Sequence, residues 1–232
     1  MQAGIAVLSG LLGEFDGWEP TRAWGRAVEM GEVAERLGFS FVWVPDHLRA
    51  VEGPDDGPTF EAFSLLSAIA DHTERIRLGP GVACAGFRNP ALLVKMVTTL
   101  DVASGGRVDF PMGAGWFEEE WRGYGYGFPP TRDRLAQLEE TLEIASRMLR
   151  PGPATWHGEH FHIERAIAAP TGLQQPRNLV HGETLGVLHA TPHGGGVQAA
   201  QLRTGQGIQP VHHTRVGGIK TQIDDPAQDD AS

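Results

Sequence analysis

With 232 residues, of which 41% are hydrophobic, the chain is long enough for one α/β domain or a large part of one. Its formal net charge of -10 argues against nucleic acid or an anionic membrane as a partner, and its single cysteine, Cys84, excludes an intramolecular disulfide and favours a reducing compartment. No apolar run reaches membrane-spanning length and the N-terminus lacks the basic region of a signal peptide, so we expect a cytoplasmic protein.

Short apolar runs and stretches of helical periodicity then alternate along the chain. Strands are expected near residues 4–8, 40–44, 76–82 and 107–111. Helices are expected over residues 21–37, 60–72, 90–104 and 131–149. The strands begin roughly every 35 residues, which is the spacing of a βα barrel or a doubly wound parallel sheet.

The stretch from Leu78 to Trp121 organises this pattern, because it contains a strand, a helix and a second strand, with a loop of small residues after each strand. Asn89 is expected to cap the helix and Pro90 fits its first position, just as Thr59 is expected to cap the helix before it. The loops at the carboxyl ends of parallel strands are where α/β proteins place their chemistry.

The C-terminal part of the chain has a different composition. Residues 155–163, which turn at Gly158-Glu159, predict a small hairpin, but from Asn178 to Ser232 there is no Phe, Trp, Tyr, Met or Cys. A segment of this kind buries too little apolar surface to offset its ordering entropy. We therefore expect a domain over residues 1–177 and an irregular, low-complexity tail over residues 178–232.

Several motifs resemble the luciferase-like flavin and deazaflavin superfamily, and most of all its F420-dependent oxidoreductases. The matching residues are Gly38-Phe39, Val42 to Leu48, Gly81 to Cys84, Phe87 to Leu93, Lys95-Met96, Thr99 to Asp101, Ser104 to Arg107, Gly113 to Trp116 and Glu118 to Glu120. The resemblance implies a (β/α)8 TIM barrel with its cofactor at the carboxyl ends of the strands. It covers about four βα units, so we expect the N-terminal half of such a barrel, as a truncation would leave.

The resemblance also implies which residues form the site. His47, after the second strand, would be the catalytic acid or base, a role that histidine often takes near neutral pH. The residues expected to contact the cofactor are Asp46, Gly81, Val82, Cys84, Gly113, Ala114 and Gly115. Gly81-Val82 matches the position of a non-prolyl cis peptide bond that supports the cofactor ring in the family.

Without the family resemblance, these candidate site residues also have purely structural interpretations. Asp46 could cap the next segment, with His47 in an ordinary turn, and Cys84 could be a small buried hydrophobe. Residues 113–115 could form a tight turn, and Gly81 could serve close packing at a strand end.

Other groups of polar residues leave alternatives open. The run Glu118–Glu120 indicates a solvated helix start rather than a catalytic cluster. Arg88 would meet either an anionic substrate or a surface acid. The spacing of His157, His160 and His162 resembles that of metal ligands, but no carboxylate or cysteine completes a site, so no metal is expected.

Some residues depart from the family pattern. Trp116 stands where the sugar-phosphate dehydrogenases of the family carry a glutamate, which argues against that substrate. Pro80, Asp109 and Pro111 interrupt the strand pattern. Since Pro111 has no N–H to donate, we expect the fourth strand to pair poorly.

On this interpretation the protein transfers a hydride between F420 and a small organic substrate. The alternative within the family is an FMN-dependent monooxygenase of the luciferase or alkanesulfonate type, which would need a flavin reductase as its partner. A third alternative is a non-catalytic remnant, because four βα units leave an open sheet whose two edges call for dimerisation.

Overall fold

The computed structural model describes residues 3–173, 185–189 and 198–202. The elements in chain order are β1 (Gly4–Ala6), α1 (Pro20–Arg36), β2 (Phe41–Val44), α2 (Ala62–Asp71), β3 (Arg77–Pro80), β4 (Ala83–Cys84), the 3-10 helix η1 (Ala85–Phe87), α3 (Pro90–Ala103), β5 (Met112–Gly113), α4 (Glu118–Gly123), α5 (Thr131–Met148), β6 (Ala154–His157), β7 (His162–Ala166), β8 (Leu185–His189) and β9 (Gln198–Leu202). Within these ranges no helix is both long and apolar enough to cross a membrane.

The first strands form a parallel sheet in the order β1-β2-β3. Val42 at its centre stands opposite Ile5 of β1 on one side and Leu78 of β3 on the other. β4 pairs in parallel with β5, and a parallel bridge between Leu78 and Val108 continues the same ladder. Strands and helices therefore alternate as predicted, which confirms the α/β class and the parallel strand order.

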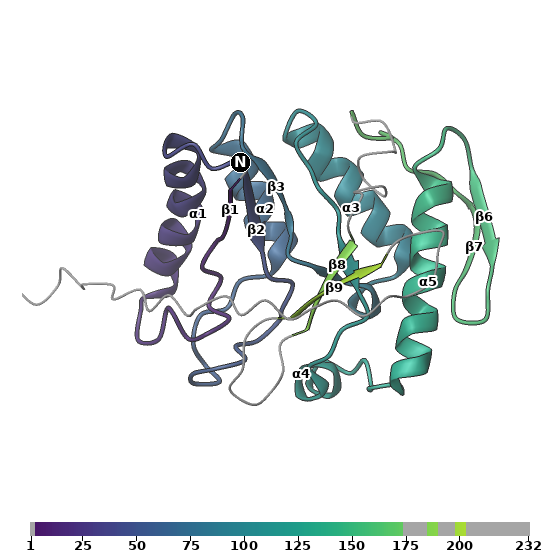
Figure 1. The fold of residues 1–232 in the computed structure, drawn as a ribbon, viewed down its shortest axis with the longest axis horizontal. Helices are drawn as coiled ribbons and strands as arrows, with labels where there is room; N and C mark the ends of the chain where they lie inside the picture. The colour runs from purple at the N-terminus through teal and green to yellow at the C-terminus, as the bar shows by residue number, and fades with distance from the viewer. Residues whose placement is uncertain (1–2, 174–184, 190–197, 203–232) are drawn as a thin grey trace, which may run out of the picture.

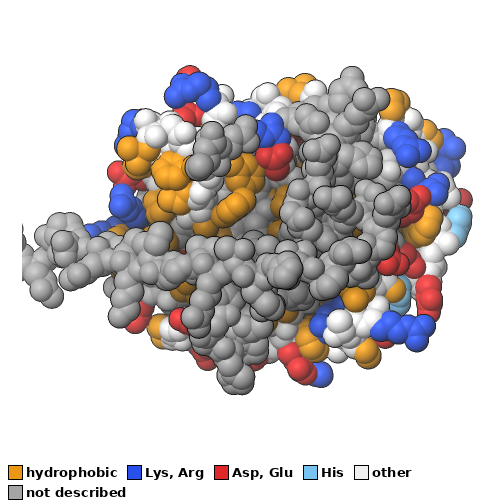
Figure 2. Space-filling model, in the orientation of Figure 1, with side chains coloured by type: hydrophobic (Ala, Val, Ile, Leu, Met, Phe, Trp, Pro, Cys, Tyr) orange, Lys and Arg blue, Asp and Glu red, His pale blue; other side chains and the backbone are white. Residues whose placement is uncertain are grey.

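Helices cover one face of this sheet. Figure 1 shows α1, α2 and α3 along it and α5 beyond α3, and α1 packs on α2, α2 on α3, and α3 on α5. Val42 and Val44 are fully buried, whereas Trp43, which points the opposite way, is 38% exposed. Figure 2 shows hydrophobic side chains at the surface on the side of the molecule that holds α1, β1 and β2. The described residues thus bury one face of the sheet more completely than the other.

The third strand is interrupted after Pro80, and the fourth is short. The strand expected over residues 76–82 is divided into β3 and β4, and the strand expected over residues 107–111 is reduced to a bridge followed by the two-residue β5. Pro80 and Pro111 cannot donate to a ladder, although the carbonyl of Pro111 still accepts from the Ala83 amide at 3.0 Å. The predicted weakness of the fourth strand is confirmed, and its predicted extent is wrong.

Side chains that accept from free amides mark where α1, α2 and α3 begin. Asn89 accepts from the Ala91 amide at 2.9 Å and caps α3, as predicted. α2, however, begins two residues later than expected, because Glu61 rather than Thr59 is its cap. The Glu61 carboxylate accepts from the Ser64 amide at 2.7 Å, and a negative charge suits a helix N-terminus.

The predicted hairpin is confirmed as β6 and β7, which pair antiparallel. Glu140 of α5 accepts from the turn amides of Glu159, His160 and Phe161 at 2.8, 3.1 and 2.9 Å. Burial opposes ionisation of Glu140, but these hydrogen bonds from Phe161, His160 and Glu159 outweigh it and lower the pKa of the carboxyl. The hairpin lies on the outer side of α5 (Figure 1), where Glu140 binds its turn and Ala154 and Ile163 pack into the core.

The C-terminal segment contains β8 and β9, which pair antiparallel along their whole length. Residues 185–189 and 198–202 are thus extended, so the segment expected to be an irregular tail is not irregular throughout. The other residues of the predicted tail lie outside the described ranges, and the boundary at residue 177 stays a prediction.

Candidate active site

A pocket lies where β2, β4 and β5 end. It is lined by Asp46, His47, Gly81, Val82, Cys84, Phe87, Gly113, Ala114, Gly115, Trp116, Phe117, Glu120 and Trp121. All the residues predicted to form the site are in this set, because the carboxyl ends of neighbouring parallel strands meet at one edge. The cavity volume is about 70 Å³, below the roughly 300–1,000 Å³ of a pocket that encloses a ligand. The described residues therefore form a pocket that is too small to enclose a ligand of that size.

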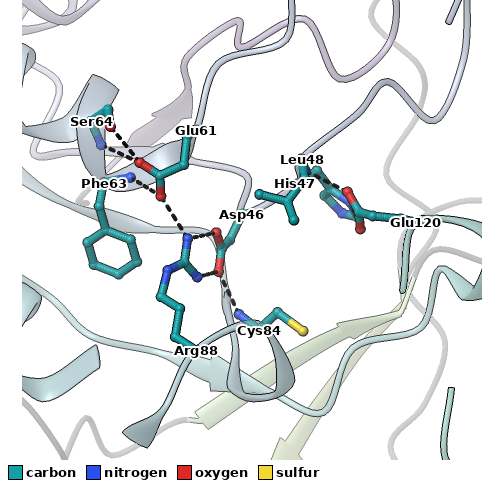
Figure 3. A network of polar contacts seen from close by, with 9 residues as sticks. All are labelled: Asp46, His47, Leu48, Glu61, Phe63, Ser64, Cys84, Arg88 and Glu120. Atoms are coloured by element: carbon teal, nitrogen blue, oxygen red, sulfur yellow. Dashed lines mark hydrogen bonds and ion pairs between the residues drawn. The ribbon is translucent and has the colours of Figure 1, made fainter. Parts of the chain in front are cut away.

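Asp46 carries a buried and extensively hydrogen-bonded carboxylate in the pocket (Figure 3). Its side chain is fully buried and receives two hydrogen bonds from the Arg88 guanidinium, at 2.7 and 2.8 Å, and one from the Cys84 amide at 2.8 Å. Arg88 also donates to Glu61 at 2.7 Å. Burial alone would lower the pKa of the Arg88 guanidinium, but Asp46 and then Glu61 raise it.

This network decides between the alternatives for Arg88. The side chain of Arg88 is only 9% exposed and pairs with two carboxylates, the buried Asp46 and the 34% exposed Glu61. The expected pairing with an acid is thus found, although the main partner is buried rather than at the surface. Asp46, predicted to contact the cofactor, lines the pocket, but both its oxygens are engaged by Arg88 and the Cys84 backbone. The Asp46 carboxylate therefore connects the loop after β2 to the segment from Cys84 to Arg88.

His47 lies beside a buried carboxylate that sequence reasoning missed. Its Nδ1 is 3.0 Å from Oε2 of Glu120, whose side chain is 1% exposed. The interpretation of Glu118–Glu120 as a solvated helix start is therefore wrong for Glu120, although Glu119 is exposed and pairs with Arg49. The six-residue helix α4 is too short for its inner face to be read from periodicity, so no sequence signal singled out Glu120.

Glycines allow the backbone to fold closely around the pocket. Gly115 has φ +75°, and a Cβ at this position would lie 2.8 Å from the Cys84 sulfur and 2.7 Å from the Trp121 ring. The peptide bond between Gly81 and Val82 is cis, as the family resemblance implied. A Cβ on Gly81 would lie 2.9 Å from the Cβ of Trp43, so neighbouring atoms require glycine at both residue 81 and residue 115.

Cys84 is buried against aromatic residues. It packs with Phe87 and Trp121, and burial raises the pKa of its thiol to about 12. A protonated, enclosed thiol is neither a nucleophile nor a metal ligand under ordinary conditions. Cys84 therefore contributes shape to the pocket, which agrees with the simpler interpretation of a small buried hydrophobe.

Aromatic rings line the pocket next to His47. The Trp116 ring centroid is 5.9 Å from that of His47 in an edge-on arrangement, and Trp116 stacks on Phe117 at 5.3 Å. The His47 side chain is 17% exposed, and its imidazole borders the apolar surface that these two rings form. Such a surface suits an uncharged part of a ligand.

Two of the histidines in the β6–β7 hairpin lie against each other. His157 and His162 are in contact through their Nδ1 atoms at 2.9 Å. Across the described ranges, no group of three or more His, Cys, Asp or Glu side chains could hold a metal ion. His157 and His162 form a surface pair, while the backbone amide of His160 is bound by Glu140.

Comparison with known proteins identifies a family that this chain matches. Residues 4–225 match the family described as luciferase-like monooxygenase, and the match extends past residue 177. An F420-dependent glucose-6-phosphate dehydrogenase from Amycolatopsis mediterranei (strain U-32) is 28% identical over 137 residues, covering 59% of this chain and 41% of its own length. An FMNH(2)-dependent dimethylsulfone monooxygenase from Pseudomonas putida is 26% identical over 200 residues, covering 85% of this chain and 51% of its own length.

A solved structure supports the same fold. Monooxygenase RslO1 from Streptomyces bottropensis superposes with a TM-score of 0.65 at 22% identity, covering 76% of this chain and 51% of its own. The chain thus spans about half the length of the relatives that it matches, and the predicted fold, part of a luciferase-like TIM barrel, is confirmed. Since the family match extends over most of its residues, the chain belongs to the luciferase-like monooxygenase family.

Proposed function

We propose that this protein is an oxidoreductase that transfers a hydride between F420 and a small organic substrate. The observation that carries the proposal is the position of His47. It lies in a pocket at the carboxyl ends of parallel strands, next to small residues on one side and aromatic rings on the other. This combination of a proton-transfer group and a surface for a flat ring is what a deazaflavin reaction needs.

The residues of the pocket fit such a cofactor. Gly81, Val82 and Ala114 present backbone and small side chains, on which a planar ring could lie. Trp121 has a buried indole N–H that makes no hydrogen bond within the described part of the chain, so a donor is left at the pocket. When bound, F420 would supply the carbon that accepts or gives the hydride. His47 would hold or move the accompanying proton at its Nε2.

The aromatic surface indicates the kind of substrate. Trp116 and Phe117 border His47. The Arg49 guanidinium lies over the Phe117 ring, but it is paired with Asp55 and Glu119. Among the described residues Arg88 is likewise paired, with Asp46 and Glu61. An uncharged substrate with an oxidisable or reducible polar group suits this surface better than a sugar phosphate. The small-molecule partner is therefore proposed to be apolar apart from the reacting group.

A second candidate is an FMN-dependent monooxygenase that receives reduced flavin from a reductase partner. The FMNH(2)-dependent relative from Pseudomonas putida covers more of this chain than the F420-dependent relative does. The same pocket residues would serve either cofactor, since both carry a flat tricyclic ring. Binding therefore separates the two candidates.

The test is to titrate the full chain with F420 and FMN separately and to follow the fluorescence of each. Saturable binding of F420, with hydride transfer, supports the proposal, whereas preferential binding of FMN supports the second candidate. Binding of neither would favour a non-catalytic protein.

His47→Ala should then lower hydride transfer by about 10²–10⁴-fold, the usual contribution of a positioned acid or base, and leave cofactor affinity nearly unchanged. His72→Ala is the matched control, because His72 is exposed at the end of α2, before β3 begins and thus away from the pocket. Equal turnover in the two variants would contradict the role of His47.

A further inference from the structure

Glu120 is a buried carboxylate that the proposed reaction does not use directly. It lies on α4, after β5, yet within the described residues its side chain contacts the segment after β2, at His47, Leu48 and Arg49. Oε1 accepts from the backbone amides of Leu48 at 2.5 Å and Arg49 at 3.3 Å, and Oε2 contacts His47 Nδ1 at 3.0 Å. Burying an unpartnered carboxylate is costly. The three contacts offset that cost and hold the Glu120 carboxylate in one position beside His47.

The contacts fix where the imidazole carries its proton. An ionised carboxylate has no hydrogen to give. With Glu120 ionised, Oε1 accepts from the two backbone amides and the hydrogen between Oε2 and Nδ1 belongs to His47. A neutral imidazole with its hydrogen on Nδ1 has a free electron pair on Nε2.

The free nitrogen is the one available to a ligand. Nε2 makes no hydrogen bond with any residue for which side chains are described, and the ring lines the pocket beside Trp116. We propose that Glu120 is a positioning residue, which holds His47 in the Nδ1–H tautomer and directs an unprotonated Nε2 into the pocket. Its effect on turnover rests on the proposed function, but the tautomer itself does not.

A purely structural role makes a different prediction. If Glu120 only tied α4 to the loop after β2, the two backbone hydrogen bonds would be what matters, and the proton on His47 would be indifferent. Glu120→Gln separates these roles. The Gln carbonyl can still accept from the Leu48 amide, but its NH₂ then faces Nδ1 and requires that nitrogen to be an acceptor. The proton of a neutral His47 would move to Nε2.

The experiment is a long-range proton–nitrogen correlation spectrum of the full chain with ¹⁵N-labelled histidine, recorded without cofactor at a pH where the ring is neutral. The His47 signals are those missing from the His47→Ala spectrum. We expect hydrogen on Nδ1 in the unsubstituted protein, hydrogen on Nε2 in Glu120→Gln, and no change in Glu119→Gln. Glu119 is the matched control because it is the exposed neighbour and contacts only the Arg49 side chain.

Turnover provides the second measurement. With whichever cofactor binds, Glu120→Gln should lower kcat at least about tenfold with little change in KM, and Glu119→Gln should leave both unchanged. An Nε2–H tautomer in the unsubstituted protein would overturn the proposal, even if Glu120→Gln failed to fold. A tautomer unchanged by Glu120→Gln, or an unchanged kcat, would also overturn it. If neither cofactor bound, the proposed function would fail while the spectra still tested the tautomer.

Discussion

Replacing Gly115 by alanine should destabilise the protein through two separable effects. The backbone there has φ +75°, a conformation that costs an L-residue about 1–2 kcal/mol. The added Cβ would also stand 2.7 Å from the Trp121 ring and 2.8 Å from the Cys84 sulfur. Both neighbours are buried, so relieving the contacts requires a shift of packed side chains, at about 1–3 kcal/mol.

Gly17 supplies the control, because it has φ +72° and nothing within 4 Å of the position a Cβ would take. Gly17→Ala therefore measures the backbone cost alone, reduced a little by the stiffer unfolded chain. We expect Gly115→Ala to lower the free energy of unfolding by about 1–3 kcal/mol more than Gly17→Ala does. Urea denaturation followed by tryptophan fluorescence measures both. Equal losses would refute the inference that Gly115 is required by Trp121 and Cys84.

Two further predictions concern the buried groups of the pocket. Asp46→Asn should lower the free energy of unfolding by about 3 kcal/mol, the low end for breaking a buried ion pair, because Arg88 then keeps only Glu61 as a charged partner. Glu61→Gln should lower it by less. Urea denaturation measures both variants, and the reverse order would contradict this account. Burial raises the pKa of the Cys84 thiol from 9.0 to about 12, so the unfolded thiol ionises first, and stability should fall as pH rises between these values. Cys84→Ala should remove that part of the pH dependence in denaturation curves, and an identical dependence in both proteins would show that Cys84 is not the group responsible.

The strands and the pocket could be predicted from sequence because their signals are local. Phe41–Val44 is a short, wholly apolar run, and Asn89 before a helical stripe marks a helix start. Since parallel strands bring their carboxyl ends together, placing His47, Cys84 and Gly113 at one edge needed only the strand order. Strand lengths were overestimated where Pro111 interrupts the pairing, because apolar character extends further than a hydrogen-bond ladder can.

The partners of charged groups could not be predicted, because they depend on contacts between distant segments. Arg88 joins Asp46 and Glu61, which lie 42 and 27 residues away, and Glu120 reaches His47 across 73 residues. A run of three glutamates looks the same in sequence whether all are solvated or one is buried. Only the direction of a short helix distinguishes Glu120 from Glu119, and that direction is set by the packing of Trp121.

These long-range pairs have a consequence for how the site is built. The pocket is formed by loops, and loops usually derive their precision from the elements that enclose them. Here the buried carboxylate of Asp46 joins the loop after β2 to the segment at β4. The buried carboxylate of Glu120 joins the same loop after β2 to α4, which follows β5. The position of His47 is thus fixed from two directions by charged hydrogen bonds within residues 46–120. Its geometry therefore follows from contacts inside the described N-terminal units, while a full enclosure of the ligand requires residues beyond them.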